Sequence, residues 1–363
     1  MLKTVNKIIN TGLIILSIVC AICLLICFLS VYISPAKIWF FAYFGLFFQF
    51  LFILNLILFI LWIVKRKKRL IILHIIALIP SIFFAGYFFR LFGSSKDIET
   101  NFENIKVLSY NIQGFKIPFQ HNTTHKEIAG FLNKEDADII CLQEFYTNDK
   151  VTEQLFQKLI SKYKYHSVYY SVKNKKNSYG IATFSKYPIK MMLEIPFEKT
   201  ANAAIYTDID VKGRILRVYN VHFQSIKLNL PKLLSSKNRM GEIEEVSSRL
   251  KTAFIKRAGQ VDIVSKHIGV SPYPVIVCGD FNDTPISYTY MKIKGNRKDT
   301  FCEAGRGMPS TYRLSFMPSF RIDYMLHDDV MNSKTYKVYK EIDYSDHYPI
   351  ASVINIEDIQ QQY

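Results

Sequence analysis

Three long apolar segments, separated by short polar stretches, occupy the first quarter of the chain. No charged residue occurs in 8–33, 38–64 or 70–89, and each segment is long enough to cross a hydrocarbon core of ~30 Å. Their Leu, Ile, Phe and Val content favours helices over barrel strands. The pattern therefore predicts a membrane anchor over 1–92, with three transmembrane helices at about 8–33, 38–64 and 70–91. The first segment is too long for a cleavable signal peptide and lacks a small-x-small site.

Basic residues in the short loops predict how this anchor is oriented. Lys3, Lys7 and the run 65–69 lie on one side of the three predicted helices, and Lys37, Arg90 and Lys96 lie on the other. Because cytoplasmic loops carry the excess of Lys and Arg, we expect the amino terminus in the cytoplasm. Everything after residue 96 is then extracytoplasmic, and the membrane is most simply a bacterial inner membrane.

After a short polar linker, 93–103, the pattern changes to brief apolar runs with turns between them. The runs predict strands at 105–112, 137–142, 165–171, 180–184, 203–211, 215–222, 275–278, 321–326, 336–339 and 350–354. Helical periodicity occurs at about 125–134, 151–162 and 242–268. Many strands with few helices predict an α/β fold over 104–363, in which two packed sheets are flanked by helices.

Charge adds little to this picture once the anchor is set aside. Residues 1–93 hold nine Lys and Arg and no acid, which leaves 37 basic against 30 acidic residues in the rest of the chain. That balance is compatible with a polyanionic substrate or an anionic membrane surface. It is not the dense basic stripe of a dedicated nucleic-acid module, and ordinary surface lysines also explain it.

Candidate chemistry begins at the turn Gly279-Asp280-Phe281-Asn282, directly after the apolar strand 275–278. Asp280 could orient or deprotonate an attacking water, and Asn282 could donate to phosphate oxygens as negative charge develops. A plain Asx turn after a strand has the same sequence, so this pair needs support from elsewhere in the chain.

Oxygen ligands for a hard cation occur at other strand ends. Glu144 follows the strand 137–142, and Mg²⁺ is usually bound through one or two carboxylates with several waters retained. Asn111, at the end of the first strand, could ligate the cation or orient a phosphate oxygen. Asp346 could join Glu144 near the metal. Turn capping and surface ion pairing are the alternatives for each residue taken alone.

Two histidines, an aspartate and an arginine complete the candidate set. Asp323 lies inside a strand and needs a partner, which His347 could be; the carboxylate would raise the pKa of that imidazole and keep it cationic beside a phosphate. His222 ends a strand and faces either a cleft or a polar surface. Arg257, after a long helical insertion at 224–256, is a candidate substrate-binding cation, although a helix-surface arginine is the alternative.

Taken together, these residues resemble the endonuclease/exonuclease/phosphatase superfamily of DNase I-like enzymes. The matching segments are 108–111, 142–144, 179–189, 220–222, 277–282, 321–324 and 345–349. The resemblance implies a four-layered α/β sandwich and hydrolysis by direct water attack, dependent on Mg²⁺ or Mn²⁺, with one or two ions.

The resemblance also implies a role for each matching residue. Glu144 would be the principal metal ligand, with Asn111 and Asp346 nearby. Asp280 would orient the nucleophile and Asn282 would bind the phosphate. His347, supported by Asp323, would stabilise charge, and His222 would protonate the leaving oxygen.

We therefore expect a membrane-anchored, Mg²⁺-dependent phosphoesterase. The first interpretation is that it is a nuclease or a general phosphodiesterase. The alternative is a lipid phosphodiesterase or phosphatase, sphingomyelinase-like or phosphoinositide-like, because three spans would hold the cleft near phospholipid head groups. The 224–256 insertion would lie close to the mouth of the site and narrow the accepted substrates. A catalytically silent binding domain is disfavoured, because every expected polar position is retained.

Overall fold

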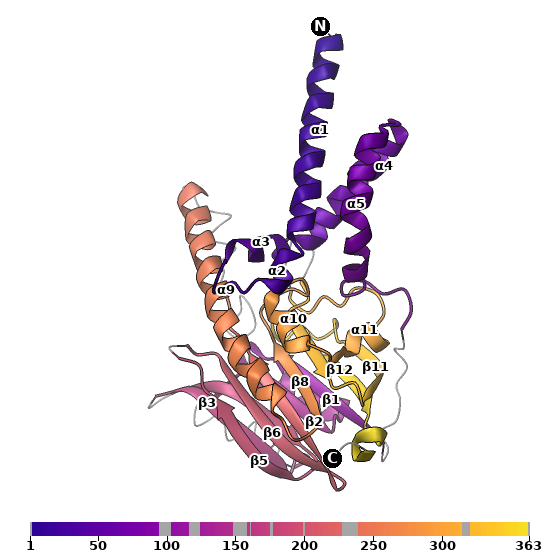
Figure 1. The fold of residues 1–363 in the computed structure, drawn as a ribbon. Coiled ribbons are helices and arrows are strands. Elements are labelled where there is room, and N and C mark those ends of the chain that lie inside the picture. The colour runs from indigo at the N-terminus through magenta and orange to yellow at the C-terminus, as the bar shows by residue number, and fades with distance from the viewer. Residues whose placement is uncertain are drawn as a thin grey trace.

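Two β-sheets packed face to face form the body of the protein (Figure 1). The computed structural model describes residues 2–93, 103–115, 124–147, 158–159, 161–174, 177–198, 200–226, 239–313 and 320–361, and within these residues each sheet has six strands.

The first sheet has the order β11-β12-β1-β2-β4-β3 and the second has the order β5-β6-β7-β8-β10-β9. The strands of the first are β1 (Asn104–Asn111), β2 (Ile139–Thr147), β3 (Tyr165–Lys173), β4 (Ser178–Ser185), β11 (Asn332–Val338) and β12 (Ile350–Asn355). Those of the second are β5 (Ile189–Ile195), β6 (Ala203–Val211), β7 (Arg214–His222), β8 (Val275–Asp280), β9 (Lys298–Asp299) and β10 (Asp323–His327). Neighbouring strands are antiparallel, except that β1 runs parallel to β2 and β7 runs parallel to β8.

Three apolar clusters hold these layers together. The central cluster lies between the sheets and includes Val107, Cys141, Val218, Ile276 and Met325. On the outer face of the first sheet, helix α6 (His125–Glu135) packs on β1 and β2. On the outer face of the second, α9 (Arg239–Gly269) and α10 (Tyr288–Lys294) pack on β7 and β8. The remaining short elements are α11 (Thr300–Ala304), η1 (Gln113–Phe115) and η2 (Glu357–Gln361). The predicted four-layered α/β sandwich is confirmed.

The predicted strands match well, with differences that have physical reasons. Strand β5 was not predicted because it is a largely exposed edge strand without clear alternation. Strand β9 and helices α10 and α11 are too short to give a periodic signal. Strand β2 continues to Thr147, beyond the predicted end at 142, because a bulge interrupts its pattern. The helix predicted at 151–162 falls largely outside the described residues.

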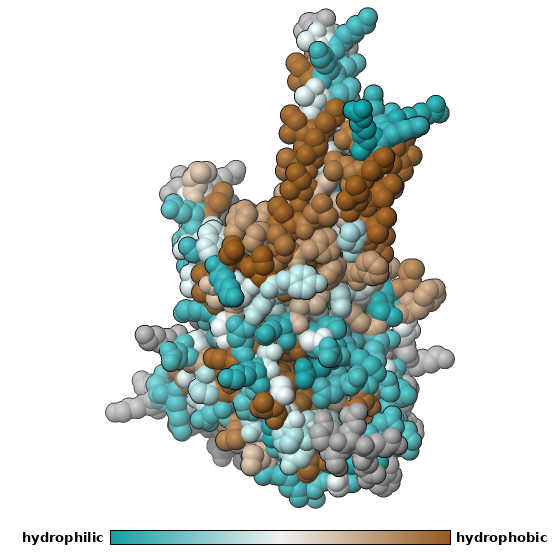
Figure 2. Space-filling model, viewed as in Figure 1, coloured by the Kyte–Doolittle hydropathy of each residue, from teal (hydrophilic) through white to brown (hydrophobic). Residues whose placement is uncertain are grey.

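The apolar amino-terminal region forms helices that project from the sandwich (Figure 1). They are α1 (Leu2–Ile26), α2 (Leu29–Tyr32), α3 (Phe40–Leu46), α4 (Phe48–Val64) and α5 (Lys68–Ala85). Two helical stretches of the described chain, 3–32 and 68–85, are long and apolar enough to cross a membrane. A third crossing results if α3 and α4 count together. An apolar belt covers these helices between their hydrophilic far ends and the largely hydrophilic sandwich (Figure 2).

The segment predicted as one helix over 38–64 is bent by 64° between α3 and α4. At this point α3 lies against the sandwich and cannot continue straight. A Cβ on Gly45 would lie 2.0 Å from the carbonyl oxygen of Ile286, so only glycine permits this close approach. Thr284 Oγ1 also donates to the carbonyl oxygen of Gly45 over 3.3 Å. The bend thus follows from docking of α3 onto the segment between β8 and α10.

Candidate active site

Polar side chains from both sheets meet at one end of the sandwich. Parallel pairing brings together the carboxyl ends of β1 and β2, where Asn111 opposes Gln143, and the ends of β7 and β8, where His222 opposes Asp280. Antiparallel β10 begins at the same edge, with Asp323 opposite Asp280. The strand order therefore places residues that are more than 200 positions apart in the sequence at a single site.

Asp280 is the centre of this arrangement. Its Oδ2 accepts hydrogen bonds from Asn111 Nδ2 (3.0 Å) and Asn282 Nδ2 (2.9 Å), and its Oδ1 accepts from the backbone N–H of Asn282 (2.8 Å). The Nε2 atoms of His222 and His347 each lie 3.7 Å from the same Oδ2. One buried carboxylate oxygen is thus held by two amides and faced by two imidazoles.

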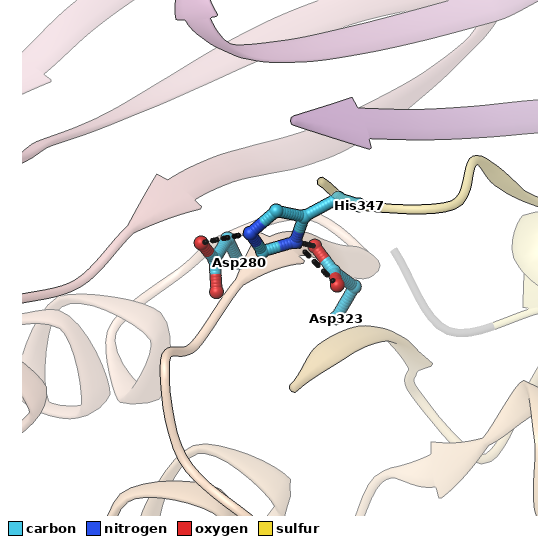
Figure 3. A group of neighbouring side chains, drawn as sticks. All are labelled: Asp280, Asp323 and His347. Atoms are coloured by element: carbon cyan, nitrogen blue, oxygen red, sulfur yellow. Dashed lines mark hydrogen bonds and ion pairs between the residues drawn. The ribbon is translucent and has the colours of Figure 1, made fainter. Parts of the chain in front are cut away.

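His347 lies between two carboxylates (Figure 3). Its Nδ1 is 2.9 Å from Asp323 Oδ2, and its Nε2 faces Asp280. Although burial works against the charged form, Asp323 and Asp280 raise the pKa of His347 well above its usual value. Burial raises the pKa of Asp280 to about 7; the Asp323 carboxylate adds to that rise, and His347 opposes it. The predicted Asp323–His347 pair is therefore formed, and the two carboxylates favour the cationic form of the imidazole.

Two residues of the site have a left-handed backbone. Glu144 has φ 53° and lies in the bulge where β2 loses register with β4, between Leu142 and Phe145. Asn282 has φ 54° in the turn after β8. Non-glycine residues rarely adopt this conformation, and such strain is concentrated at functional sites. The bulge leaves the Glu144 side chain at the pocket, about a quarter exposed, within a strand whose other residues are buried except for Tyr146.

Glu144 is surrounded by donors. Its Oε1 lies 3.5 Å from Asn111 Nδ2 and 3.7 Å from His222 Nε2. Tyr179 forms a side-chain hydrogen bond to it, and burial together with this carboxylate raises the pKa of Tyr179. The side-chain oxygen Oδ1 of Asn111 accepts from the backbone N–H of Gln113 (3.1 Å). In this arrangement Asn111 orients both acids through its amide nitrogen.

These side chains line a cavity of about 740 Å³. Its polar floor includes Glu144, Asp280 and Asp346, and among the described residues that line it there is no lysine or arginine. The Asp346 side chain is about a quarter exposed, and its Oδ1 lies 4.0 Å from His347 Nε2. Accessible carboxylates with no lysine or arginine among the described lining residues fit a divalent metal that keeps part of its water shell.

A second arrangement of possible ligand atoms is the buried trio Asp280, Asp323 and His347, whose ligand atoms lie within 4.8 Å of one another. The Nδ1 of His347 is already bound to Asp323, however, and all three side chains are buried. Because Mg²⁺ usually retains several waters, Glu144 and Asp346 fit the ion better than this trio does.

Arg257 is not placed as its prediction requires. The residue is fully buried in α9, and its Nη1 lies 2.8 Å from Asp283 Oδ2 while its Nε and Nη2 donate to the carbonyl oxygen of Gln224. Both the prediction of a substrate-binding cation and the alternative of a surface arginine are wrong in this structure. The charge instead holds the wall of the cavity, since Asp283 lines it and Arg257 lies behind it.

Several residues that matter for the geometry were not identified from the sequence. Gln143 Nε2 donates to Asn220 Oδ1 (2.8 Å), and Asn220 Nδ2 donates to the carbonyl oxygen of Ala182 (2.9 Å), so a buried amide pair joins the two sheets beneath the site. The Tyr312 ring packs on His347 with centroids 5.1 Å apart. Their only signal in the sequence is a polar or aromatic residue beside a recognised motif, which is too common to be informative.

Comparison with known proteins defines the class. Residues 108–347 match the model of the endonuclease/exonuclease/phosphatase family, and residues 6–88 match a domain of unknown function (DUF8431). An exodeoxyribonuclease of Bacillus subtilis (strain 168) is 24% identical and is aligned over its whole length and 69% of this chain. Similar folds occur in the endonuclease/exonuclease/phosphatase of Bacteroides vulgatus (TM-score 0.53, 17% identity, 70% of this chain and 99% of that chain). The protein of the same description from Beutenbergia cavernae gives a TM-score of 0.51 at 16% identity, over 70% of this chain and 72% of that chain.

The fold and the family match therefore define a hydrolase of phosphoric esters. The chain belongs to the endonuclease/exonuclease/phosphatase family, whose enzymes use divalent metal ions. The resemblance inferred from the sequence motifs is confirmed.

Proposed function

We propose that this protein is a membrane-anchored, Mg²⁺-dependent phosphodiesterase whose catalytic domain lies outside the cytoplasm. The observation that carries the proposal is the set of groups around Asp280: two amides fix its carboxylate, two imidazoles face it, and the Nε2 of one of them, His222, also lies 3.7 Å from Glu144. Attack of water on a phosphoester requires a base in a fixed orientation, proton donors beside it and an accessible carboxylate that can bind a metal, and Asp280, the two histidines and Glu144 meet these requirements.

Each residue then has a defined part in the reaction. Asp280 takes a proton from the attacking water as the water oxygen bonds to phosphorus. His347, held cationic by Asp323, donates to a non-bridging phosphate oxygen and stabilises the charge that develops there. The bond from phosphorus to the leaving oxygen breaks as His222 gives that oxygen a proton. Asn111 and Asn282 keep the Asp280 carboxylate in position, and the proposed phosphate contact of Asn282 adds to that role.

Glu144 and Asp346 are the proposed metal ligands, with Asn111 beside them. The bound Mg²⁺, or Mn²⁺, would supply Lewis-acid stabilisation of the phosphoryl oxygens. Glu144 and Asp346 fit the ion because their carboxylates face the cavity and no lysine or arginine of the described lining neutralises them.

The test uses the full-length protein in lipid nanodiscs with bis(p-nitrophenyl) phosphate as a general phosphodiester. We expect hydrolysis with Mg²⁺ and none with EDTA. Asp280→Asn and His347→Gln should each lower kcat by about a hundredfold or more. Glu341→Gln is the control, since this acid is exposed and pairs only loosely with Lys337 at 4.0 Å. Hydrolysis that survives EDTA would remove the metal from the mechanism, and an active Asp280→Asn variant would remove the proposed base.

The membrane assignment has its own support and its own test. Lys3, Lys7 and the basic run 65–69 lie at the far ends of α1 and of the α4–α5 hairpin, across the apolar belt from the sandwich (Figure 2). By the positive-inside rule this end is cytoplasmic. Protease added to intact spheroplasts should therefore digest the catalytic domain. Digestion only after the inner membrane is lysed would reverse the orientation.

The substrate is the finest level of the proposal. A polynucleotide is the first candidate, because the Bacillus subtilis relative is named an exodeoxyribonuclease. A phospholipid is the second candidate, and the apolar residues in the cavity wall favour it.

A further inference from the structure

The cavity above the catalytic residues has two chemically different halves. The floor carries the carboxylates and imidazoles of the site. The upper wall is apolar and includes Leu46, Phe47, Val246, Leu250, Phe320 and Ile322. Leu46 and Phe47 form the bend between α3 and α4, and two of the others come from α9. The amino-terminal helices therefore supply part of the wall of the active-site cavity.

This wall is fixed in place by direct contacts between the helices and the sandwich. Tyr43 donates to the carbonyl oxygen of Ser247 on α9 (2.8 Å), and its ring packs on Phe254 with centroids 5.4 Å apart. Lys251 lies over the Trp39 ring at 4.8 Å. Together with the close approach of Gly45 to the turn after Asn282, these contacts hold the bend directly over the catalytic turn.

The apolar wall is continuous with the belt on the helices. Phe47 lines the cavity and is also 44% exposed, and on α4 the exposed residues Ile53, Ile57 and Ile60 follow it. The belt meets the sandwich at this level (Figure 2). A hydrocarbon chain in the surrounding bilayer could therefore run along α4 and into the cavity without leaving an apolar surface.

A polynucleotide suits this cavity poorly. Nucleic acids are held mainly by Lys and Arg that neutralise successive phosphates, and none occurs among the described residues of the lining. Burying hydrocarbon against Leu46, Phe47 and Leu250 would instead be favourable, at roughly 25 cal/mol for each Å² removed from water.

We infer that the bend at Leu46 and Phe47 is a specificity-determining part of the active site and that the substrate is an amphiphilic phosphodiester. This substrate is a membrane lipid, whose hydrocarbon chain lies on the apolar wall while its phosphate reaches Asp280. This inference rests on the proposed hydrolytic function and names its substrate class. The reaction is the water attack described above, and it releases the head group or the phosphorylated head group from the lipid.

The experiment compares two substrates that differ only in one alkyl chain, ethyl p-nitrophenyl phosphate and dodecyl p-nitrophenyl phosphate, with the full-length protein in nanodiscs. We expect kcat/KM to be at least about tenfold higher for the dodecyl ester, since each buried CH₂ contributes to binding. The double variant Leu46→Ala/Phe47→Ala should lose most of that gain, so that its ratio of kcat/KM for the dodecyl ester to kcat/KM for the ethyl ester falls toward one.

The matched control is Ile63→Ala/Val64→Ala, two adjacent residues at the far end of α4, 48% and 76% exposed, which neither line the cavity nor belong to the apolar path of Ile53, Ile57 and Ile60. This control removes similar apolar volume from the same helix and should keep the full gain. Because the dodecyl ester partitions equally into every nanodisc sample, partitioning cannot produce a difference between the two variants.

The possible outcomes distinguish a wrong lipid substrate from a wrong phosphodiesterase activity. Equal kcat/KM for the two esters, an unchanged gain in the Leu46→Ala/Phe47→Ala variant, or faster cleavage of single-stranded DNA than of the dodecyl ester would each overturn the lipid assignment and leave the phosphodiesterase standing. Failure to hydrolyse any of these esters or DNA would overturn the proposed function itself.

Discussion

Asp323 and Asp280 are direct partners on neighbouring antiparallel strands, and the imidazole of His347 lies between their carboxylates. Strands β10 and β8 thus fix two acids at a spacing that the backbone sets. The histidine itself comes from the loop before β12, on the other sheet. Its position relative to Asp280 therefore depends on the packing of the two sheets and on the hydrogen bond to Asp323.

We predict that Asp323→Asn lowers kcat for bis(p-nitrophenyl) phosphate by about a hundredfold or more, because His347 loses the carboxylate that orients it and favours its charged form. The melting temperature should also fall at neutral pH, because the buried imidazolium loses its carboxylate partner, so kcat is measured well below the melting temperature of the variant. Asp329→Asn, at an exposed position after the same strand, is the control and should keep full activity. A kcat within a few fold of the original would show that the pair does not contribute to catalysis.

Gly279 is required for the approach of β8 to β7. Its φ is 138°, and a Cβ there would lie 2.0 Å from the carbonyl oxygen of Val221. We predict that Gly279→Ala lowers the free energy of unfolding by at least about 3 kcal/mol, measured by urea denaturation in detergent.

The control for this variant is Gly259→Ala on the exposed side of α9, where an added Cβ meets nothing within 4 Å. Alanine is the better helix former, so that variant should be unchanged or more stable by up to about 1 kcal/mol. Equal stability of the two variants would contradict the steric argument.

The sequence predicted much of this fold because each layer has its own periodicity. Alternating runs predicted most strands of both sheets, and the 3.6-residue pattern predicted α6 and α9. The site residues followed from one physical regularity, that a polar side chain directly after an apolar strand lies at a sheet edge. Asp280, Glu144 and His222 all meet that description, and the structure brings them together.

What the sequence could not predict depends on contacts between distant segments. Arg257 seemed to be a surface or cleft residue because helical periodicity does not reveal that Asp283 lies opposite it. The bend at Phe47 interrupts a uniformly apolar segment, and its cause is a carbonyl oxygen of Ile286, far along the chain. Hydrophobic periodicity in the sequence predicts the face of a helix or strand on which a residue lies. It does not predict which distant residues pack against that face.

We predict that Glu144→Gln and Asp346→Asn each weaken binding of Mn²⁺ by about tenfold or more, because each removes a charged oxygen ligand that neighbouring groups help to orient. Electron paramagnetic resonance of free Mn²⁺ measures this binding without any need for activity. Glu194→Gln, an exposed acid on β5, is the control and should bind Mn²⁺ as the original protein does. Unchanged affinity in both site variants would place the metal elsewhere, for instance at Asp280, Asp323 and His347.

Glu303 should make stability depend on pH at a place remote from catalysis. Its Oε2 lies 2.8 Å from His327 Nε2 and accepts from the backbone N–H of Ser333 (3.0 Å). Burial opposes ionisation, but these hydrogen bonds outweigh it and lower the pKa of Glu303 below its usual value. A carboxylate with a lowered folded-state pKa contributes stability above its unfolded pKa and loses that contribution as the pH falls through the folded value.

We therefore expect Glu303→Gln to lower the free energy of unfolding at neutral pH by about 1 kcal/mol and so to lower the melting temperature. The difference between the variant and the original protein should disappear in acid, once the carboxyl group is protonated in both states. Thermal unfolding monitored by circular dichroism between neutral and acid pH measures it. Glu341→Gln, whose side chain is exposed, should show no such dependence. A constant difference at every pH would mean that the shape of the side chain at 303, and not its charge, is what stabilises the junction of α11 with β10 and β11.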